Sequence, residues 1–144
     1  MPESGPPTPE IISHYRLLRR IGAGGMGQVF EGIDRRDESP VAVKLMWPHL
    51  AMDSNFRTRF EKEAHVASLL HSPYTVKLFD FGYSAGWYYL IMEYVAGESL
   101  AQRLQRGPLS EHAAVEIAVD VARALEEAET RRVVHRDLKP ENIL

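Results

Sequence analysis

The stretch His135–Asn142 reads "HRDLKPEN" and gathers an acid, a base and an amide in one short loop near the end of the 144-residue chain. The carboxylate of Asp137 can accept a proton from an attacking hydroxyl, and the ammonium of Lys139 can neutralise charge on a phosphoryl group. The amide oxygen of Asn142 suits magnesium, which prefers oxygen ligands. The stretch therefore predicts phosphoryl-group chemistry. The alternative to this functional interpretation is a charged surface loop capped by proline.

A glycine cluster, "GAGGMGQV", occupies residues 22–29. Glycine-rich turns let backbone N–H groups approach phosphate oxygens because no Cβ stands in the way. The same letters fit the dinucleotide pattern G-x-G-x-x-G, which requires a helix from the last glycine. The residues after Gly27, "QVFEGI", favour a strand instead. We therefore expect a strand–loop–strand that covers a phosphate group, with a plain hairpin turn as the alternative.

Two charged residues stand among apolar neighbours between these stretches. Lys44 lies in the strand-like "PVAVKLM", where Val41, Val43 and Leu45 alternate with the other face. Glu63 falls on a helical stripe made of residues 56, 60, 63, 67 and 70. A carboxylate on such a stripe is costly unless a cation pairs with it, so we predict a buried ion pair with Lys44. Either residue alone could instead reach solvent.

The expected secondary structure is strand-rich first and helix-rich later, which is an α+β pattern. Residues 1–12 are rich in Pro, Ser, Glu and Thr and are expected to be disordered. Strands are expected at 15–22, 28–33, 39–47, 75–81 and 87–95. Helices are expected at 52–71, 97–107 and 110–130, the last with Ser110 as its N-cap.

The composition excludes several classes of function. The net charge of −3 gives no bulk attraction to nucleic acid or anionic membranes. No apolar run is long enough to span a bilayer. The absence of cysteine excludes disulfides and thiolate metal sites and fits a reducing cytoplasm. The six histidines are scattered along the chain and do not predict a metal site.

In order along the chain, "IGAGGMGQVF", "VAVK", "RFEKEA", "IMEYVAGESL" and "VHRDLKPENIL" resemble the eukaryotic-type protein kinases. These motifs are most similar to those of bacterial serine/threonine kinases. The resemblance covers residues 15–144. The resemblance implies a five-stranded antiparallel sheet with one long helix in an N-lobe, followed by the start of a helical C-lobe. A partial kinase domain would then cover 13–144, with its N-lobe at about 13–95 and its C-lobe at about 96–144.

The resemblance also implies a role for each matching residue, with ATP and Mg²⁺ as cofactors. Asp137 would be the catalytic base, with Lys139 beside the transferred phosphate and Asn142 on magnesium. Lys44 would contact the α- and β-phosphates and pair with Glu63. The remaining nucleotide-binding residues would be Ile21, Gly22, Gly24, Gly25, Gly27, Val29, Ala42, Met92, Glu93, Val95 and Leu144.

The sequence also departs from the family pattern. The family's DFG motif, activation loop and A-P-E segment would follow residue 144, so we expect part of a longer kinase that transfers little phosphate by itself. The earlier tripeptide Asp80-Phe81-Gly82 spells DFG but precedes the catalytic loop, and we expect it to end a strand. Arg132 stands where the family often has glycine in a left-handed conformation. A catalytically silent pseudokinase or regulatory module is the alternative function.

The resemblance implies protein substrates and is compatible with homodimerisation or autophosphorylation. We expect no nucleic-acid partner, no membrane segment in this chain and a cytoplasmic location. Relatives of this type can continue into a transmembrane segment and a sensor domain, so a longer parent protein with a membrane anchor stays open.

Overall fold

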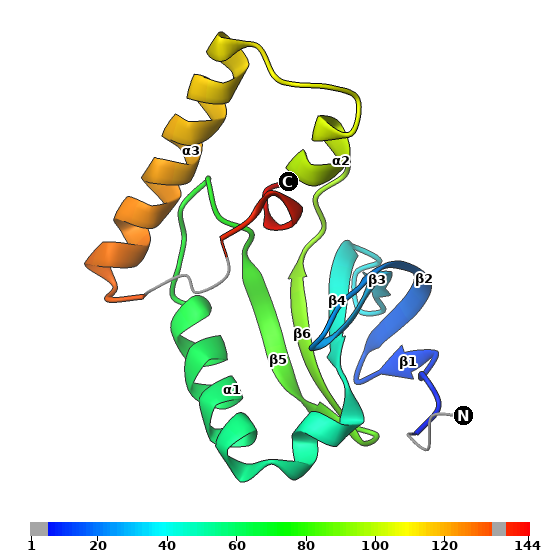
Figure 1. The fold of residues 1–144 in the computed structure, drawn as a ribbon. Coiled ribbons are helices and arrows are strands. Elements are labelled where there is room, and N and C mark those ends of the chain that lie inside the picture. The colour runs from blue at the N-terminus through cyan, green and yellow to red at the C-terminus, as the bar shows by residue number, and fades with distance from the viewer. Residues whose placement is uncertain (1–5, 134–137) are drawn as a thin grey trace. The chain divides into compact units, whose positions relative to one another are not determined.

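The computed structural model describes residues 6–133 and 138–144. The chain forms two compact units (Figure 1). The first comprises Met1–Leu69 and Lys77–Tyr94, and the second comprises Leu70–Val76 and Val95–Leu144. Among the described residues, no helix has the length and apolar character that crossing a membrane requires.

The first unit is built on a six-stranded antiparallel sheet with the order β1-β2-β3-β4-β6-β5. The strands are β1 (Ile11–Ile12), β2 (Tyr15–Ala23), β3 (Gly27–Asp34), β4 (Pro40–Met46), β5 (Leu78–Ser84) and β6 (Trp87–Glu93). Five strands were expected, and the sixth is the short β1, which pairs with the start of β2. The expectation of disorder through residue 12 is wrong at this strand, because Ile12 is fully buried in the core.

The two faces of the sheet carry two apolar clusters, as the alternation in β4 predicts. Cluster one covers one face and consists of Ile12, Tyr15, Phe30, Val41, Val43, Leu45, Trp87, Tyr89 and Ile91. Cluster two covers the other face, where Met46 and Tyr88 pack against Phe56 and Phe60 of helix α1 (Ser54–Ala67). Side chains at alternate positions of a strand point to opposite faces. Lys44 therefore shares a face with Met46 and with α1.

Helix α1 is shorter than the expected 52–71. Its N-cap is Asp53, whose side chain accepts a hydrogen bond from the backbone N–H of Asn55 at 2.9 Å. The residues before it form a 3₁₀ turn, η1 (Pro48–Met52), which has proline in its first turn. The buried helical residues are Phe56, Phe60 and Ala64, a spacing of four that a helix places on one face.

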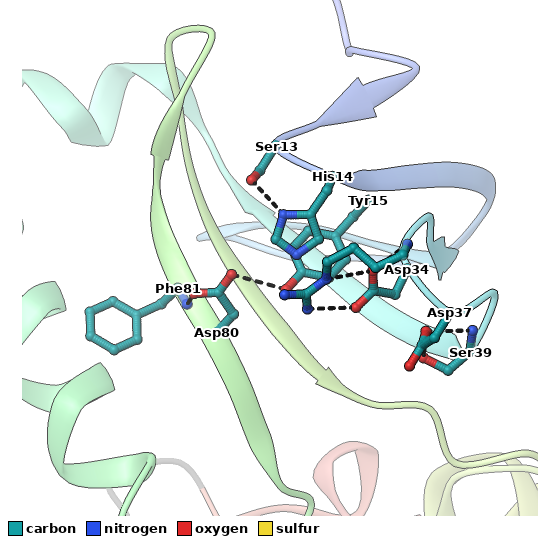
Figure 2. A network of polar contacts seen from close by, with 9 residues as sticks. Ser13, His14, Tyr15, Asp34, Asp37, Ser39, Asp80 and Phe81 are labelled. Atoms are coloured by element: carbon teal, nitrogen blue, oxygen red, sulfur yellow. Dashed lines mark hydrogen bonds and ion pairs between the residues drawn. The ribbon is translucent and has the colours of Figure 1, made fainter.

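The tripeptide Asp80-Phe81-Gly82 lies inside β5 and does not end the strand (Figure 2). The strand extends to Ser84 because the turn to β6 needs only Ala85 and Gly86, which both have positive φ values, 52° and 85°. Asp80 accepts hydrogen bonds from the Tyr15 hydroxyl at 2.9 Å and the Phe81 backbone N–H at 2.8 Å. Asp80 is therefore held by contacts within the sheet.

The other two members of the tripeptide are explained by packing. The Phe81 ring makes an edge contact with Phe60 of α1, with 6.5 Å between ring centroids. Gly82 faces Tyr89 across β5 and β6, and a Cβ at Gly82 would lie 2.9 Å from the Tyr89 hydroxyl oxygen. The glycine thus makes room for an aromatic ring on the neighbouring strand.

Two side chains of the same polar network have shifted pKa values (Figure 2). Burial, and then the hydrogen bond to Asp80, raise the pKa of the Tyr15 phenol above its usual value. At the end of β3, hydrogen bonds from the Arg36 side chain and backbone lower the pKa of Asp34 to about 2. The Arg36 guanidinium binds both carboxylate oxygens of Asp34, at 3.1 and 2.7 Å.

The second unit is mostly helical. Helix α2 (Leu100–Leu104) begins with a capping box between Ser99 and Gln102. Helix α3 (Glu111–Thr130) begins at the N-cap Ser110, whose hydroxyl accepts from the Ala113 N–H at 3.1 Å, as expected. Segment 70–76 contacts α3: the His71 N–H donates to the Glu127 carboxylate at 2.8 Å, and Arg123 donates to the Tyr74 hydroxyl at 2.8 Å.

Past the end of α3, Arg132 has a φ of 56°, the left-handed conformation that the sequence predicted. The carbonyls at the helix end accept bonds from the turn that follows, including Val133 N–H to Ala128 at 2.8 Å. A non-glycine residue in this conformation carries a cost in backbone energy. The chain thus keeps the turn without the residue that adopts it most easily.

Candidate functional site

The glycine loop is a hairpin between β2 and β3. Gly22 pairs with Val29 across the two strands, and the Gly24 N–H donates to the Gly27 carbonyl at 2.8 Å. A strand and not a helix follows Gly27. The dinucleotide-binding alternative, which needs a helix at that point, is therefore excluded.

The glycines of this loop fall into two groups. A Cβ at Gly27 would lie 2.0 Å from the carbonyl oxygen of Leu45, so this position is glycine because β4 passes too close. A Cβ at Gly22, Gly24 or Gly25 would meet nothing within 4 Å. None of the four has a positive φ. Among the described glycines, only Gly86, Gly97 and Gly107 have one. Neither backbone conformation nor packing inside the protein explains Gly22, Gly24 and Gly25.

Several of the predicted nucleotide-binding residues lie on one face of the sheet. Val29 pairs with Lys44 across β3 and β4, and Ala42 pairs with Met92 across β4 and β6. Directly opposed residues of antiparallel strands point to the same side. Gly22, Val29, Lys44, Ala42 and Met92 therefore share a face although they come from four strands. Ala42 is buried and Lys44 is half-buried.

The other predicted residues of the first unit lie at its edges. Ile21 is exposed on β2 next to the glycine loop. Glu93 ends β6, where its N–H donates to the Lys77 carbonyl at 2.8 Å and its carboxylate accepts from the Lys77 N–H at 3.2 Å. Glu93 is thus fixed by segment 77–78 at the point where the chain leaves the first unit.

Glu63 differs from the sequence-based expectation. It lies on α1 but is exposed, whereas Phe56, Phe60 and Ala64 form the buried stripe. The prediction of a buried carboxylate is wrong, because the stripe follows a spacing of four and Glu63 lies one position before Ala64. The proposed pairing of Glu63 with Lys44 stays a prediction.

In the second unit, the described part of the catalytic-loop stretch forms a tight turn. The 3₁₀ turn η2 (Pro140–Asn142) has proline at its start, and the Asn142 N–H donates to the Lys139 carbonyl at 2.9 Å. The Leu100 N–H at the start of α2 donates to the Ile143 carbonyl at 2.7 Å, which holds the end of this turn. Lys139, Asn142 and Leu144 are exposed. Asp137, the predicted base, lies outside the described residues.

Val95 begins the second unit and is exposed.

The sequence-based reasoning also missed one residue that contacts the glycine loop. Trp47, which follows β4, donates from its indole Nε1 to the Gly24 carbonyl at 2.9 Å. An aromatic residue after a strand is a common pattern and does not reveal a partner that is distant in sequence.

The family model for the protein kinase domain matches residues 15–144. The chain therefore belongs to the protein kinase family. It is 45% identical over 131 residues to the serine/threonine-protein kinase PknE of Mycobacterium tuberculosis. The matched region covers 90% of this chain and 23% of PknE. The chain is 40% identical over 145 residues to PknD of the same organism, with 100% and 22% covered.

Solved structures agree with this assignment. The crystal structure of the Mycobacterium tuberculosis PknI kinase domain matches with a TM-score of 0.81 and 32% sequence identity, and covers 90% of this chain and 53% of that one. The α+β kinase fold expected from the sequence is confirmed, with six strands in place of five. The chain spans about a quarter of the length of the curated relatives it matches (23% and 22%).

Proposed function

We propose that this chain supplies the ATP-binding part and the catalytic loop of a serine/threonine protein kinase, which transfers the γ-phosphoryl group of ATP to protein hydroxyls. The observation that carries the proposal is the open space at Gly22, Gly24 and Gly25 beside the face that holds Lys44. Backbone N–H groups without neighbouring side chains can approach phosphate oxygens closely. Membership of the protein kinase family supports the same assignment.

The first unit would hold most of the nucleotide. The glycine loop would cover the phosphates, and Lys44 would contact the α- and β-phosphates while paired with Glu63. Ile21, Val29, Ala42 and Met92 would pack on the adenine, and the backbone at Glu93 and Val95 would bond its polar edge. The shared face of Val29, Lys44, Ala42 and Met92 supports this arrangement. Leu144 would be the floor of the adenine site.

The catalytic loop would complete the chemistry. The carboxylate of Asp137 would accept the proton of the substrate hydroxyl. The oxygen of that hydroxyl would bond to the γ-phosphorus while the bond from the γ-phosphorus to the β–γ bridging oxygen breaks, which releases ADP. The Lys139 ammonium would offset the charge on the transferred group. These roles would place proton transfer and charge neutralisation on residues two positions apart in the sequence.

Asn142 is the residue of this chain that would help to hold a magnesium ion arriving with ATP. Asn142 is exposed at the end of η2 and offers an amide oxygen, and magnesium in such sites is held by a few protein oxygens together with phosphates and water. Within the described residues, no group of three or more His, Asp or Glu side chains gathers into a protein-only metal site. When bound, the ion would neutralise phosphate charge.

Transfer to serine or threonine is supported by two observations. A lysine two positions after the catalytic aspartate is typical of serine/threonine kinases within the family, and Lys139 holds that position. The relatives PknE and PknD are both named serine/threonine-protein kinases. The protein substrate and any homodimer or autophosphorylation are further parts of the proposal.

The test is a transfer assay on the full product of the gene, with ATP labelled at the γ-phosphate and a general protein substrate. We expect labelled phosphoserine and phosphothreonine, with turnover lowered by about a thousandfold or more in Asp137→Asn or Lys44→Met. Circular dichroism of each variant separates lost chemistry from lost folding. ATP binding without transfer in the full product would show a pseudokinase and contradict the proposal. The 144-residue chain alone is expected to bind ATP and transfer little.

A further inference from the structure

Trp47 contacts the glycine loop at two points. Its indole Nε1–H donates to the Gly24 carbonyl at 2.9 Å, and its backbone N–H donates to the Met26 carbonyl at 2.9 Å. The indole itself is partly buried against cluster one, the apolar cluster on the face of the sheet opposite Lys44. One rigid residue therefore holds the loop at both sides of Gly25.

The loop has few other means to fix its shape. Gly22, Gly24 and Gly25 have no side chains to pack, and a Cβ on any of them would find no neighbour within 4 Å. Glycine loses more conformational freedom on ordering than other residues. Beyond the pairing of β2 with β3, which runs to Ala23 and Gln28, the loop is closed by the bond from the Gly24 N–H to the Gly27 carbonyl at 2.8 Å. The two bonds from Trp47 add to this pairing and hold the carbonyls of Gly24 and Met26.

The bond to Gly24 also sets the direction of a neighbouring donor. The carbonyl of Gly24 and the N–H of Gly25 belong to the same peptide plane, and in a trans peptide these two groups point in opposite directions. Because the carbonyl is turned toward the indole, the Gly25 N–H points away from it. A donor aimed away from the protein's own packing is suited to an external acceptor such as a phosphate oxygen.

We propose that Trp47 is a positioning residue for the nucleotide phosphates: its indole holds the Gly24 carbonyl and thereby aims the Gly25 N–H at a phosphate oxygen. The inference rests on the proposed function, since it assumes that the glycine loop covers ATP. The ligand class it predicts is a nucleoside di- or triphosphate. Adenosine lacks the phosphates and does not depend on the loop in this way.

The test compares ATP·Mg²⁺ and adenosine binding to the 144-residue chain by isothermal titration calorimetry. Trp47→Phe removes the indole donor and keeps an aromatic ring. Trp87→Phe is the matched control, because Trp87 belongs to the cluster that Trp47 packs against but, among the described residues, its buried indole N–H has no hydrogen-bond partner. Loss of one hydrogen bond corresponds to about three- to tenfold in affinity. We expect Trp47→Phe to raise the Kd of ATP by that factor and to leave the Kd of adenosine unchanged. Trp87→Phe should change neither.

The outcomes separate two kinds of failure. If the folded wild-type chain binds neither ATP nor adenosine, the proposed function fails. If the wild type binds ATP and Trp47→Phe binds it equally well, or weakens ATP and adenosine alike, the positioning role of Trp47 is overturned while the proposed function stands. Since the chain has two tryptophans, nuclear magnetic resonance offers a second readout. Saturating ATP should shift the indole N–H signal of Trp47 more than that of Trp87, and equal shifts would count against the inference.

Discussion

The two units differ in how far their own packing explains their residues. In the first unit Ile12, Val43, Leu45 and Ile91 are all 0% exposed, and an apolar cluster lies on each face of the sheet. In the second unit Ala128 is the one buried apolar residue among those described, and α3 leaves Val115, Val119 and Leu125 exposed. Part of the apolar face of α3 is therefore exposed.

This difference decides where an unexplained residue is informative. In the well-packed first unit, Gly27 and Gly82 are explained by atoms that a Cβ would strike. The open surroundings of Gly22, Gly24 and Gly25 are therefore an exception that points to an external ligand. In the second unit most described side chains are exposed, so open space around a residue does not indicate an external ligand. The loop glycines carry the proposal for this reason.

The largest expected effect is the loss of a core residue of the first unit. Ile91→Ala should lower the free energy of unfolding by about 2–5 kcal/mol, because it removes buried methyl groups and leaves a cavity. Val115→Ala is the matched change in the second unit and should stay within about 0.5 kcal/mol, since Val115 is exposed. Urea denaturation of both variants measures the difference. Equal losses would break the contrast between the units.

The Tyr15–Asp80 hydrogen bond tests whether the first unit depends on its polar contacts as well as on apolar packing. Tyr15→Phe removes the hydroxyl that donates to Asp80 at 2.9 Å and leaves the carboxylate short of a partner. We expect a loss of about 1–3 kcal/mol in unfolding free energy. In the Asp80→Asn background the same substitution should cost less, because an amide needs the donor less than a carboxylate does. Equal costs in both backgrounds would show that the charge of Asp80 does not strengthen the bond.

Arg132 offers a gain of stability in the second unit. Arg132→Gly should raise the unfolding free energy by about 0.5–1 kcal/mol, because glycine adopts the observed φ of 56° without steric cost. Arg131→Gly is the control: Arg131 has a φ of −93°, and glycine there should destabilise the chain. Thermal unfolding of the two variants measures opposite shifts of Tm. A loss in Arg132→Gly would mean that its side chain contributes more than its backbone costs.

The smallest expected effect depends on pH and concerns Asp34 at the end of β3. Hydrogen bonds from Arg36 lower the folded-state pKa of Asp34 to about 2 from its usual 3.8. A depressed pKa contributes stability at pH values above the unfolded pKa, and this stability is lost as the pH falls toward the folded pKa. The difference in Tm between the wild type and Asp34→Asn should be constant above pH 5 and shrink between pH 4 and 2. A constant difference down to pH 2 would contradict the role of Arg36.

The sequence predicted most of the fold because its signals were local or repeated. The alternation in β4, the Ser110 cap and the left-handed turn at Arg132 each depend on residues close in the chain. The motifs gave the family. Strand β1 was missed because two residues are too few to show a period. The exposure of Glu63 was missed because the sequence alone does not show which side of α1 faces the sheet.

The candidate site could be predicted as a set of residues but not as a geometry. The sequence pointed to the glycine cluster, yet only the approach of Leu45 to Gly27 separates the glycine needed for packing from the three that are not. The Trp47 contact joins the residue after β4 to the loop between β2 and β3, and no local pattern encodes it. Distances between segments that are far apart in sequence are what the structure adds.

The most direct test of the account replaces the two kinds of glycine and measures folding and ATP binding together. The triple variant Gly22→Ala, Gly24→Ala, Gly25→Ala should fold with wild-type or higher stability, because alanine lowers the entropy of the unfolded chain and meets no neighbour. Its Kd for ATP should rise by about tenfold or more, a free-energy change of about 1.4 kcal/mol. Gly27→Ala should instead lose about 1–3 kcal/mol of stability. A triple variant that binds ATP as tightly as the wild type would contradict the claim that these glycines are kept for the phosphates.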